Sequence, residues 1–198
     1  MSIFDLHTLL PAWIGDFLHH EASCFPDVTA RMAFVIRLTS RNVAEGSGGP
    51  FGAAVFERDS GVLVAVGVNA VVASHCSHAH AEMVALALAQ QRLETHDLAS
   101  PGLPTHELVT SCEPCAMCLG AIPWSGVKRV VCGARDADAR AIGFDEGSKP
   151  AHWQQTLTAR GIEVLTDVLR DDAVTVLKHY LATGGMLYNA CTDKEHDP

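Results

Sequence analysis

The chain has 198 residues, of which 48% are hydrophobic and 19% are charged. This composition is typical of one folded domain, and it excludes a disordered chain and a collagen-like repeat. The formal net charge of −9 argues against a protein that holds nucleic acid through its phosphates, because such binding needs clustered lysines and arginines.

Cysteine usage indicates a reducing compartment. The number of cysteines is odd, and no secretory signal is expected because Pro11 and Asp16 interrupt the apolar N-terminal stretch. No run approaches the roughly 20 apolar residues that span a membrane. We therefore expect a cytoplasmic protein in which clustered cysteines bind a metal or catalyse a reaction. The seven cysteines are Cys24, Cys76, Cys112, Cys115, Cys118, Cys132 and Cys191.

The hydrophobic pattern of the first part of the chain predicts helices and a β-hairpin. Apolar residues recur at helical spacing within residues 2–20, where Pro11 interrupts the pattern, and again within residues 27–44. Two apolar runs, residues 51–57 and 62–68, flank an Asp-Ser-Gly turn signal and predict a hairpin. The loops expected here are residues 45–50 and 69–79.

The rest of the chain alternates between predicted helices and strands. Residues 95–105 and the polar, glycine-containing residues 136–150 are expected to be irregular. The expected helices are residues 80–93, 115–124, 151–160 and 171–182, and the expected strands are residues 107–111, 127–133 and 162–165.

This order of elements predicts an α/β fold. Strands joined by helical crossovers run parallel, whereas the two strands of a hairpin run antiparallel. We therefore expect a three-layer α/β/α domain whose mixed five-stranded sheet, a hairpin followed by parallel strands, is flanked by helices. The domain would span residues 1–198, with an N-terminal helical extension over 1–29 and a C-terminal tail over 184–198. Because the tail contains the apolar residues Met186, Leu187 and Tyr188 past the last helix, it is expected to cover a pocket, its own or a partner's.

Three metal-ligand side chains stand at the starts of two predicted helices. His80 opens one helix, and Cys115 and Cys118 lie three residues apart, on one face of the first turn of the other. A helix N-terminus also favours the thiolate form of cysteine. One imidazole and two thiolates are three protein ligands, the pattern of a catalytic zinc site that keeps its fourth position for water.

Glu82 adds a proton-transfer group to this set. It follows His80 by two residues, a spacing that does not suit shared metal binding but lets the carboxylate face a bound water. His-x-Glu combined with Pro-Cys-x-x-Cys is the signature of zinc-dependent nucleobase deaminases. Each half is a weak signal, and the two together at helix starts are a strong one.

A structural zinc site is the alternative interpretation. Such a site has four protein ligands, and Cys112, Cys76 or His78 could supply the fourth. A domain of this length has enough core without a metal, and Glu82 would then have no role. Cys112 is expected to be a buried residue at the end of a strand, and Trp124 to pack at the end of its helix.

Longer motifs carry a resemblance to a known family. They are GGPFGAAVFERDSG (48–61), VNAVV (68–72), HAE (80–82), LVTSCEPCAMCLGAIPWSGVKRVVCGAR (108–135) and AIGFDEG (141–147). Together they resemble the cytidine deaminase superfamily, and within it the bacterial guanine deaminases, especially the subgroup that also acts on the triazine ammeline. The chain has Cys76-Ser77-His78 where many relatives have Asp-Pro-Thr, in a segment that shapes the pocket wall.

The resemblance implies a role for each matched residue. Zinc would be held by His80, Cys115 and Cys118, one ion per chain. Glu82 would be the first proton shuttle and Glu146 the second, with Asp145 as the alternative for the second. The expected substrate-binding residues are Asn69, which would hydrogen-bond the purine, Phe51 and Phe144, which would contact its ring, and Asp145 and Ala81.

The resemblance also implies the reaction and the partners. The expected reaction is hydrolysis of guanine to xanthine and ammonia by a homodimer, with ammeline as a second substrate and without membrane or nucleic acid partners. One rival is a tRNA adenosine deaminase, which the charge of −9 disfavours. A second rival is a cytidine or deoxycytidylate deaminase, and a third is a non-catalytic zinc module. A nucleotide substrate would need a phosphate-binding Arg or Lys, and the sequence identifies none.

Overall fold

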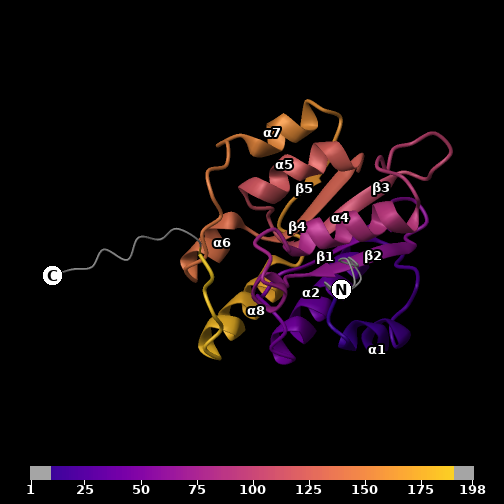
Figure 1. The fold of residues 1–198 in the computed structure, drawn as a ribbon. Helices are drawn as coiled ribbons and strands as arrows, with labels where there is room; N and C mark the ends of the chain where they lie inside the picture. Colours follow the sequence, from indigo (N-terminus) through magenta and orange to yellow (C-terminus); the bar gives the residue numbers. More distant parts are fainter. Residues whose placement is uncertain (1–9, 190–198) are drawn as a thin grey trace.

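The computed structural model describes residues 10–189 (Figure 1). Its strands are β1 (Gly52–Glu57), β2 (Leu63–Val68), β3 (His106–Cys112), β4 (Arg129–Ala134) and β5 (Glu163–Leu165). Its helices are α1 (Trp13–His19), α2 (Val28–Ala44), α3 (Val71–Ser74), α4 (Ala81–Arg92), α5 (Ala116–Ser125), α6 (Asp136–Ala141), α7 (Trp153–Thr158) and α8 (Arg170–Ala182).

The strands form one mixed sheet in the order β2-β1-β3-β4-β5. β1 is antiparallel to both β2 and β3, whereas β3, β4 and β5 are parallel. Helices cover both faces, with α4, α5 and α7 on one side and α2 and α8 on the other (Figure 1). The predicted α/β/α fold with a hairpin followed by parallel strands is confirmed.

The central strand β3 is buried along its whole length, because helices cover both of its faces. Successive residues therefore enter opposite cores. Leu108 packs in the core beneath α4 and α5, and Val109 packs in the core beneath α2. β3 also carries buried polar residues, among them Glu107, which therefore need partners inside the protein.

Several predicted boundaries are close to those observed, and two short helices were not predicted. Asp27 caps α2 by accepting a hydrogen bond from the Ala30 N–H. The predicted helix over residues 2–20 is observed as α1, which begins after Pro11; residues 1–9 lie outside the described part. The prediction of an irregular stretch over 136–150 is wrong for α6, and that of a loop over 69–79 is wrong for the single turn α3.

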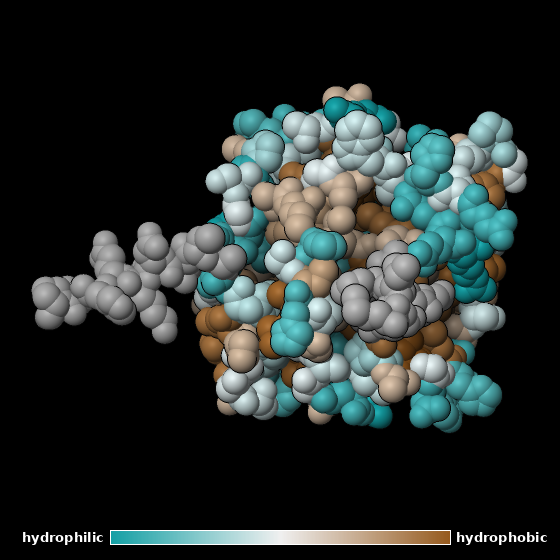
Figure 2. Space-filling view, viewed as in Figure 1, coloured by the Kyte–Doolittle hydropathy of each residue, from teal (hydrophilic) through white to brown (hydrophobic). Residues whose placement is uncertain are grey.

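None of the helices in residues 10–189 is long and apolar enough to cross a bilayer. On the face seen in Figure 2, hydrophobic residues are interspersed with hydrophilic ones.

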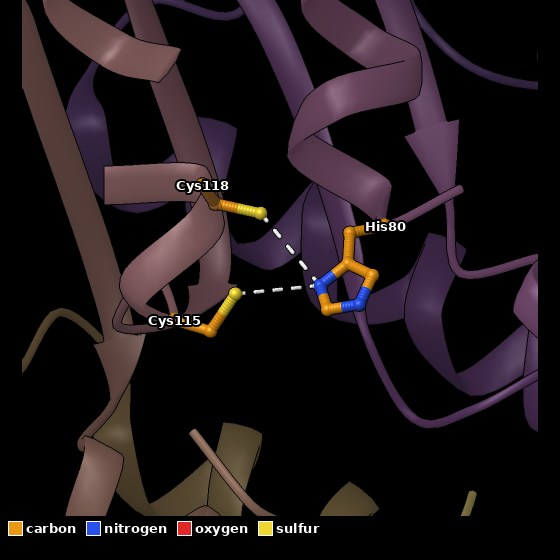
Figure 3. Close-up of side chains that lie close together, drawn as sticks. All are labelled: His80, Cys115 and Cys118. Carbon is orange, nitrogen blue, oxygen red and sulfur yellow. Dashed lines mark hydrogen bonds between the residues drawn. The ribbon is translucent and has the colours of Figure 1, made fainter. Parts of the chain in front are cut away.

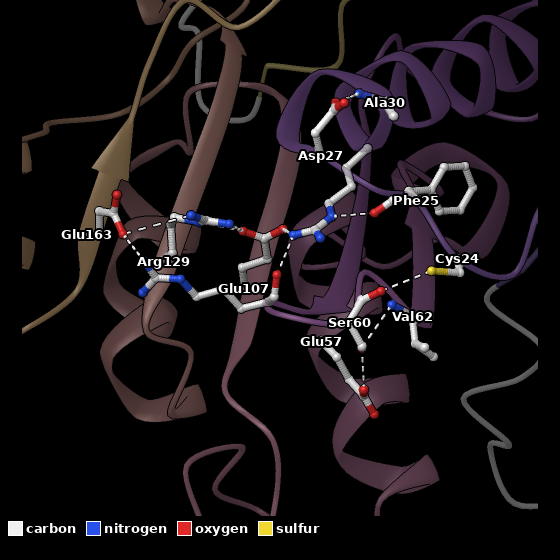
Figure 4. Close-up of polar contacts among 12 residues, drawn as sticks. Cys24, Phe25, Asp27, Ala30, Glu57, Ser60, Val62, Glu107, Arg129 and Glu163 are labelled. Carbon is white, nitrogen blue, oxygen red and sulfur yellow. Dashed lines mark hydrogen bonds and ion pairs between the residues drawn. The ribbon is translucent and has the colours of Figure 1, made fainter.

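A buried ion cluster ties α2 to the sheet (Figure 4). The carboxylate of Glu107 on β3 is fully buried and accepts hydrogen bonds from Arg31 of α2 and Arg129 of β4. Arg129 also lies 3.9 Å from Glu163 at the start of β5. Such a cluster fixes the position of α2 on the sheet, because each buried charge needs its partners in place of the water that it has lost.

Glu107→Gln is expected to destabilise the protein by about 3–5 kcal/mol, because it leaves two buried guanidinium groups without their carboxylate. Urea unfolding followed by circular dichroism measures the change. Glu45→Gln is the matched control, since Glu45 forms an exposed i,i+4 pair with Arg41 whose loss should cost under about 0.5 kcal/mol. Equal effects of the two substitutions would contradict the structural role of the cluster.

Candidate active site

The sheet topology brings the starts of α4 and α5 together. β1 is antiparallel to both β2 and β3, so β2 and β3 point in the same direction and end at the same edge. The chain leaves β2 for α4 and leaves β3 for α5. Both helices therefore begin at this edge, where crossover folds gather their functional side chains.

Three side chains at these helix starts form a potential metal site (Figure 3). His80 is the N-cap residue of α4, and its Nδ1 lies 3.5 Å from Sγ of Cys115 and 3.7 Å from Sγ of Cys118. In a tetrahedral zinc site a sulfur and a nitrogen ligand are about 3.6 Å apart, given Zn–S of about 2.3 Å and Zn–N of about 2.0–2.1 Å. The predicted donor set therefore fits zinc in both chemistry and spacing.

A fourth protein ligand is not found among residues 10–189, where this is the one group of metal-binding side chains. The side chains considered for that position make different contacts. Cys112 is buried at the end of β3, as predicted, and its thiol reaches the carbonyl of Arg135. Cys76 lies 3.3 Å from His78, its neighbour in the loop. The geometry therefore matches a site that keeps one position for a non-protein ligand.

The two thiols differ in acidity before any metal binds. The hydrogen bond from Cys118 and that from His80 lower the pKa of Cys115 to about 4. Donation of that hydrogen bond to Cys115, with burial, raises the pKa of Cys118. A metal binds both sulfurs as thiolates, so the proton of Cys118 must leave when the metal binds.

The carboxylate of Glu82 lies directly beside the three ligands. It is 6% exposed, and its Oε2 accepts a hydrogen bond from the Cys118 thiol at 3.4 Å. Burial and the neighbouring Cys115 thiolate raise the pKa of Glu82. A carboxyl group with a raised pKa can both take and return a proton near neutral pH.

A cavity of about 330 Å³ opens onto the ligands, a size at the lower end for small-molecule sites. Ala81 does not line it, since this residue is fully buried behind His80. All the other predicted site residues do line it except Cys118, which is fully buried next to Cys115. The predicted residues in its wall are Phe51, Asn69, His80, Glu82, Cys115, Phe144, Asp145 and Glu146.

Residues 28–134 match the model of the cytidine and deoxycytidylate deaminase zinc-binding region. The chain belongs to this deaminase family. It is 38% identical over 135 residues to the guanine deaminase of Bacillus subtilis, covering 62% of this chain and 82% of that one.

Solved structures match a larger share of this chain. The guanine deaminase of Nitrosomonas europaea is 53% identical, with a TM-score of 0.83, over 87% of this chain and 94% of that one. The protein NE0047 in complex with 2,6-diaminopurine is also 53% identical, with a TM-score of 0.85, over 91% and 95% of the two chains.

Asn69 of this deaminase is a buried residue with a fixed orientation. Its Oδ1 accepts hydrogen bonds from the N–H groups of Gly49 at 3.3 Å and Val71 at 3.4 Å. Two backbone donors identify the oxygen end of the amide, which leaves the NH2 end to donate. The close approach needs glycine, because a Cβ on Gly48 would lie 1.7 Å from the carbonyl oxygen of Asn69.

The neighbouring carboxyl groups Asp145 and Glu146 are in different environments. Glu146 is 7% exposed, and burial, with the Cys115 thiolate and Glu82, raises its pKa to about 8. The side chain of Asp145 is 55% exposed, and its Oδ1 accepts a hydrogen bond from the N–H of Gly147. Glu146 is therefore largely protonated at pH 7, which suits a proton donor.

The end of the described chain forms part of the same cavity wall. Tyr188 and Asn189 line the cavity of their own chain, and the ring of Tyr188 packs edge-on against Phe144 at 5.2 Å. The amide of Asn189 donates to the carbonyl of Gly143 and accepts from the N–H of Asp145. The apolar tail predicted Tyr188 near a pocket, whereas no sequence signal indicated Asn189.

One prediction near this site is wrong. Trp124, expected to pack at the end of its helix, is 84% exposed in the described structure. Met117, on the same helix α5, is 38% exposed and lines the cavity. Hydrophobic helical spacing cannot by itself distinguish a side chain that packs in its own core from one that remains at the surface.

Proposed function

We propose that the protein hydrolyses guanine to xanthine and ammonia. The observation that carries this proposal is a small cavity in which two buried carboxyl groups, Glu82 and Glu146, flank a three-ligand metal site. Two bacterial guanine deaminases are relatives of this chain, and they support guanine as its substrate. The complex of NE0047 with 2,6-diaminopurine supports a purine substrate that carries an exocyclic amino group.

We infer that His80, Cys115 and Cys118 hold one zinc ion. Zinc, when bound there, supplies Lewis acidity that lowers the pKa of water to about 7. Glu82 takes a proton from the attacking water and passes it to ring N3 of guanine, so that C2 can become tetrahedral. Its burial and its hydrogen bond with Cys118 hold the carboxyl group next to the three ligands.

Glu146 supplies the proton that the departing nitrogen needs. The C2–N bond breaks as ammonia leaves, because NH2⁻ is too basic to depart without a proton. Burial keeps Glu146 protonated at neutral pH. The overall reaction consumes one water, which supplies the oxygen at C2 of xanthine, the proton at N3 and the third hydrogen of ammonia. The remaining proton of the water, released as the C2 carbonyl forms, restores the carboxyl group of Glu146.

The cavity wall orients the ring. We expect the amide of Asn69 to bind a polar edge of the purine. Phe51 and Phe144, whose ring centroids are 4.9 Å apart, supply an apolar surface for its face. Fixed orientation of two reactants can supply several kcal/mol of the barrier reduction. The triazine ammeline is a smaller ring with a similar amidine, and we infer that it is a second substrate.

The test compares ammonia release by the zinc-loaded protein from guanine, ammeline, adenine, cytosine and cytidine. Guanine is expected to react fastest. A salt-sensitive shift of tRNA in a gel, together with inosine formation and no turnover of guanine, would instead favour a tRNA adenosine deaminase.

Glu146→Gln is expected to lower kcat for guanine by about 10²–10⁴-fold, whereas Asp145→Asn changes it only a few-fold. In the unaltered protein kcat should fall as the pH rises above about 8, because Glu146 then loses the proton that it must donate. A pH profile of kcat for the three proteins measures both effects. A larger loss in Asp145→Asn would assign the proton transfer to Asp145.

Removal of the tail after Gly184 is expected to lower kcat/KM for guanine by about 10–100-fold, because Tyr188 and Asn189 complete the cavity wall and hold the segment that carries Phe144. Steady-state kinetics of the shortened chain measure this. Met186→Ala is the control, since this residue is exposed and does not line the active-site cavity. Unchanged kinetics in the shortened chain would show that the tail has no role.

We also infer that the whole chain folds as one deaminase domain and forms a homodimer. The exposed Trp124 and Met117 on α5 support a dimer, because large apolar side chains at a surface are typical of contact sites. Sedimentation of the protein and of Trp124→Ser tests it. A dimer that dissociates in the variant is expected, and a monomer in both would contradict it.

A further inference from the structure

Lys149 is a buried charge next to the active site that the proposed mechanism does not use. Its side chain is only 7% exposed. Its Nζ lies 2.8 Å from Oδ1 of Asp136 and 3.7 Å from Oε2 of Glu113. The same Nζ lies over the ring of Trp153, 5.4 Å from the ring centroid. A lysine is rarely buried unless such partners hold it, so its position is well defined.

The ammonium group also binds the loop that carries a metal ligand. Lys149 Nζ donates to the carbonyl oxygen of Pro114 at 3.0 Å. Pro114 is a buried residue immediately before Cys115. A buried carbonyl oxygen needs a hydrogen-bond donor, and among the described residues Lys149 donates to this one.

A second contact lies three residues earlier in the same segment. The carbonyl of Glu146 accepts a hydrogen bond from the N–H of Ala116, the first residue of α5, at 2.9 Å. The two contacts therefore flank Cys115, with Pro114 on one side and Ala116 on the other. They join the segment 146–149 to the metal-ligand loop at two points.

Arg140 of α6 also donates to the carbonyl of Gly147 at 2.7 Å, but the contacts at Glu146 and Lys149 are the ones that fix the direction of the segment relative to the metal-ligand loop. We infer that Lys149 is a positioning residue, which keeps the segment that carries Glu146 aligned with the loop around Cys115. The inference rests on the proposed function, because it makes Lys149 act through the Glu146 carboxyl group. It adds a residue that does not touch the cavity to the set that determines kcat.

Charge strengthens this assignment. Glu113 and Asp136 are linked, since the N–H of Asp136 donates to Oε2 of Glu113 at 3.1 Å. Glu113 also lines the cavity. Loss of the Lys149 charge would leave these two carboxylates to repel each other and would loosen the same loop.

The test is a double-mutant cycle on kcat for guanine with Lys149→Met and Glu146→Gln. Methionine keeps most of the length and the packing on Trp153 but removes the charge and the donor. Lys149→Met is expected to lower kcat by about 10–100-fold, with KM changed less than about three-fold and zinc content unchanged, because a small misplacement of a reacting group costs this much. Lys149→Arg should recover part of the loss, since it keeps the charge.

The decisive result is non-additivity. In the Glu146→Gln background the additional Lys149→Met change is expected to have almost no effect, because both act on one proton transfer. Effects that multiply, or a Lys149→Met variant with normal kcat, would overturn the inference. If Lys149→Met does not fold, the same cycle with Lys149→Arg decides.

Two controls accompany the cycle. Arg37→Met removes an ion pair to Glu21, neither of which lines the cavity, and should leave kcat unchanged. The unaltered protein is assayed in parallel. If the unaltered protein forms no xanthine, the proposed function is wrong. If the unaltered protein turns over guanine and Lys149→Met does so equally fast, the proposed function stands and only the role of Lys149 is wrong.

Discussion

Glu82→Gln is expected to lower kcat for guanine by about 10²–10⁴-fold while the purified protein keeps its zinc. Glutamine has nearly the same shape, but it cannot take a proton from water and return it to the ring. The metal ligands are unaffected, because Glu82 accepts a hydrogen bond from Cys118 and is not one of the three ligands that face each other.

Single-turnover kinetics and metal analysis of the same preparation separate the two effects. Asp145→Asn is the matched control, since it also removes a carboxylate from the cavity wall but leaves both buried carboxyl groups. Near-normal kcat in Glu82→Gln would show that another group moves the proton. Loss of zinc would show that Glu82 is needed for metal binding.

Cys115→Ala is expected to abolish both zinc binding and turnover. It reduces the donor set to His80 and Cys118, and two ligands do not hold zinc against dilution. The fold should persist, because its two cores beneath α4 and α2 do not depend on the metal.

Metal analysis after dialysis, with circular dichroism to monitor folding, measures this outcome. Cys24→Ala is the control, since Cys24 is exposed and hydrogen-bonded to the carbonyl of Ser60, far along the chain from the site. Zinc that stays bound in Cys115→Ala would place the metal on a different set of ligands, such as Cys76 and His78.

The metal site was predictable from sequence because all of its ligands stand at helix starts. His80 and Cys115 are 35 residues apart, and the N-terminal geometry of each helix fixes where its side chain lies. The strand directions then bring the two helix starts to one edge. Local patterns and the rules of strand connection were sufficient for this part of the site.

Other features depend on contacts that no local pattern contains. The helix α6 consists of six polar and small residues, and it is held by an ion pair from Arg170 to Asp138 that joins segments 32 residues apart. Asn189 and Lys149 take their roles from backbone carbonyls that are distant in sequence. A carbonyl oxygen has the same identity at every position, so sequence alone does not indicate which one needs a donor.

The exposure of Glu146 and Asp145 likewise became clear only from the structure. The two residues are adjacent and chemically alike, and the resemblance left both open for the second proton transfer. Burial distinguishes them, since Glu146 is buried whereas the side chain of Asp145 is more than half exposed. The same contrast of environments separates acid from base in many enzymes.

The most direct test of the account is to identify the products that the zinc-loaded protein forms from guanine. We predict xanthine and ammonia in equal amounts, with little of either formed by Glu82→Gln. Absence of xanthine, in a protein that holds one zinc per chain and has the expected fold, would contradict guanine deamination as its function.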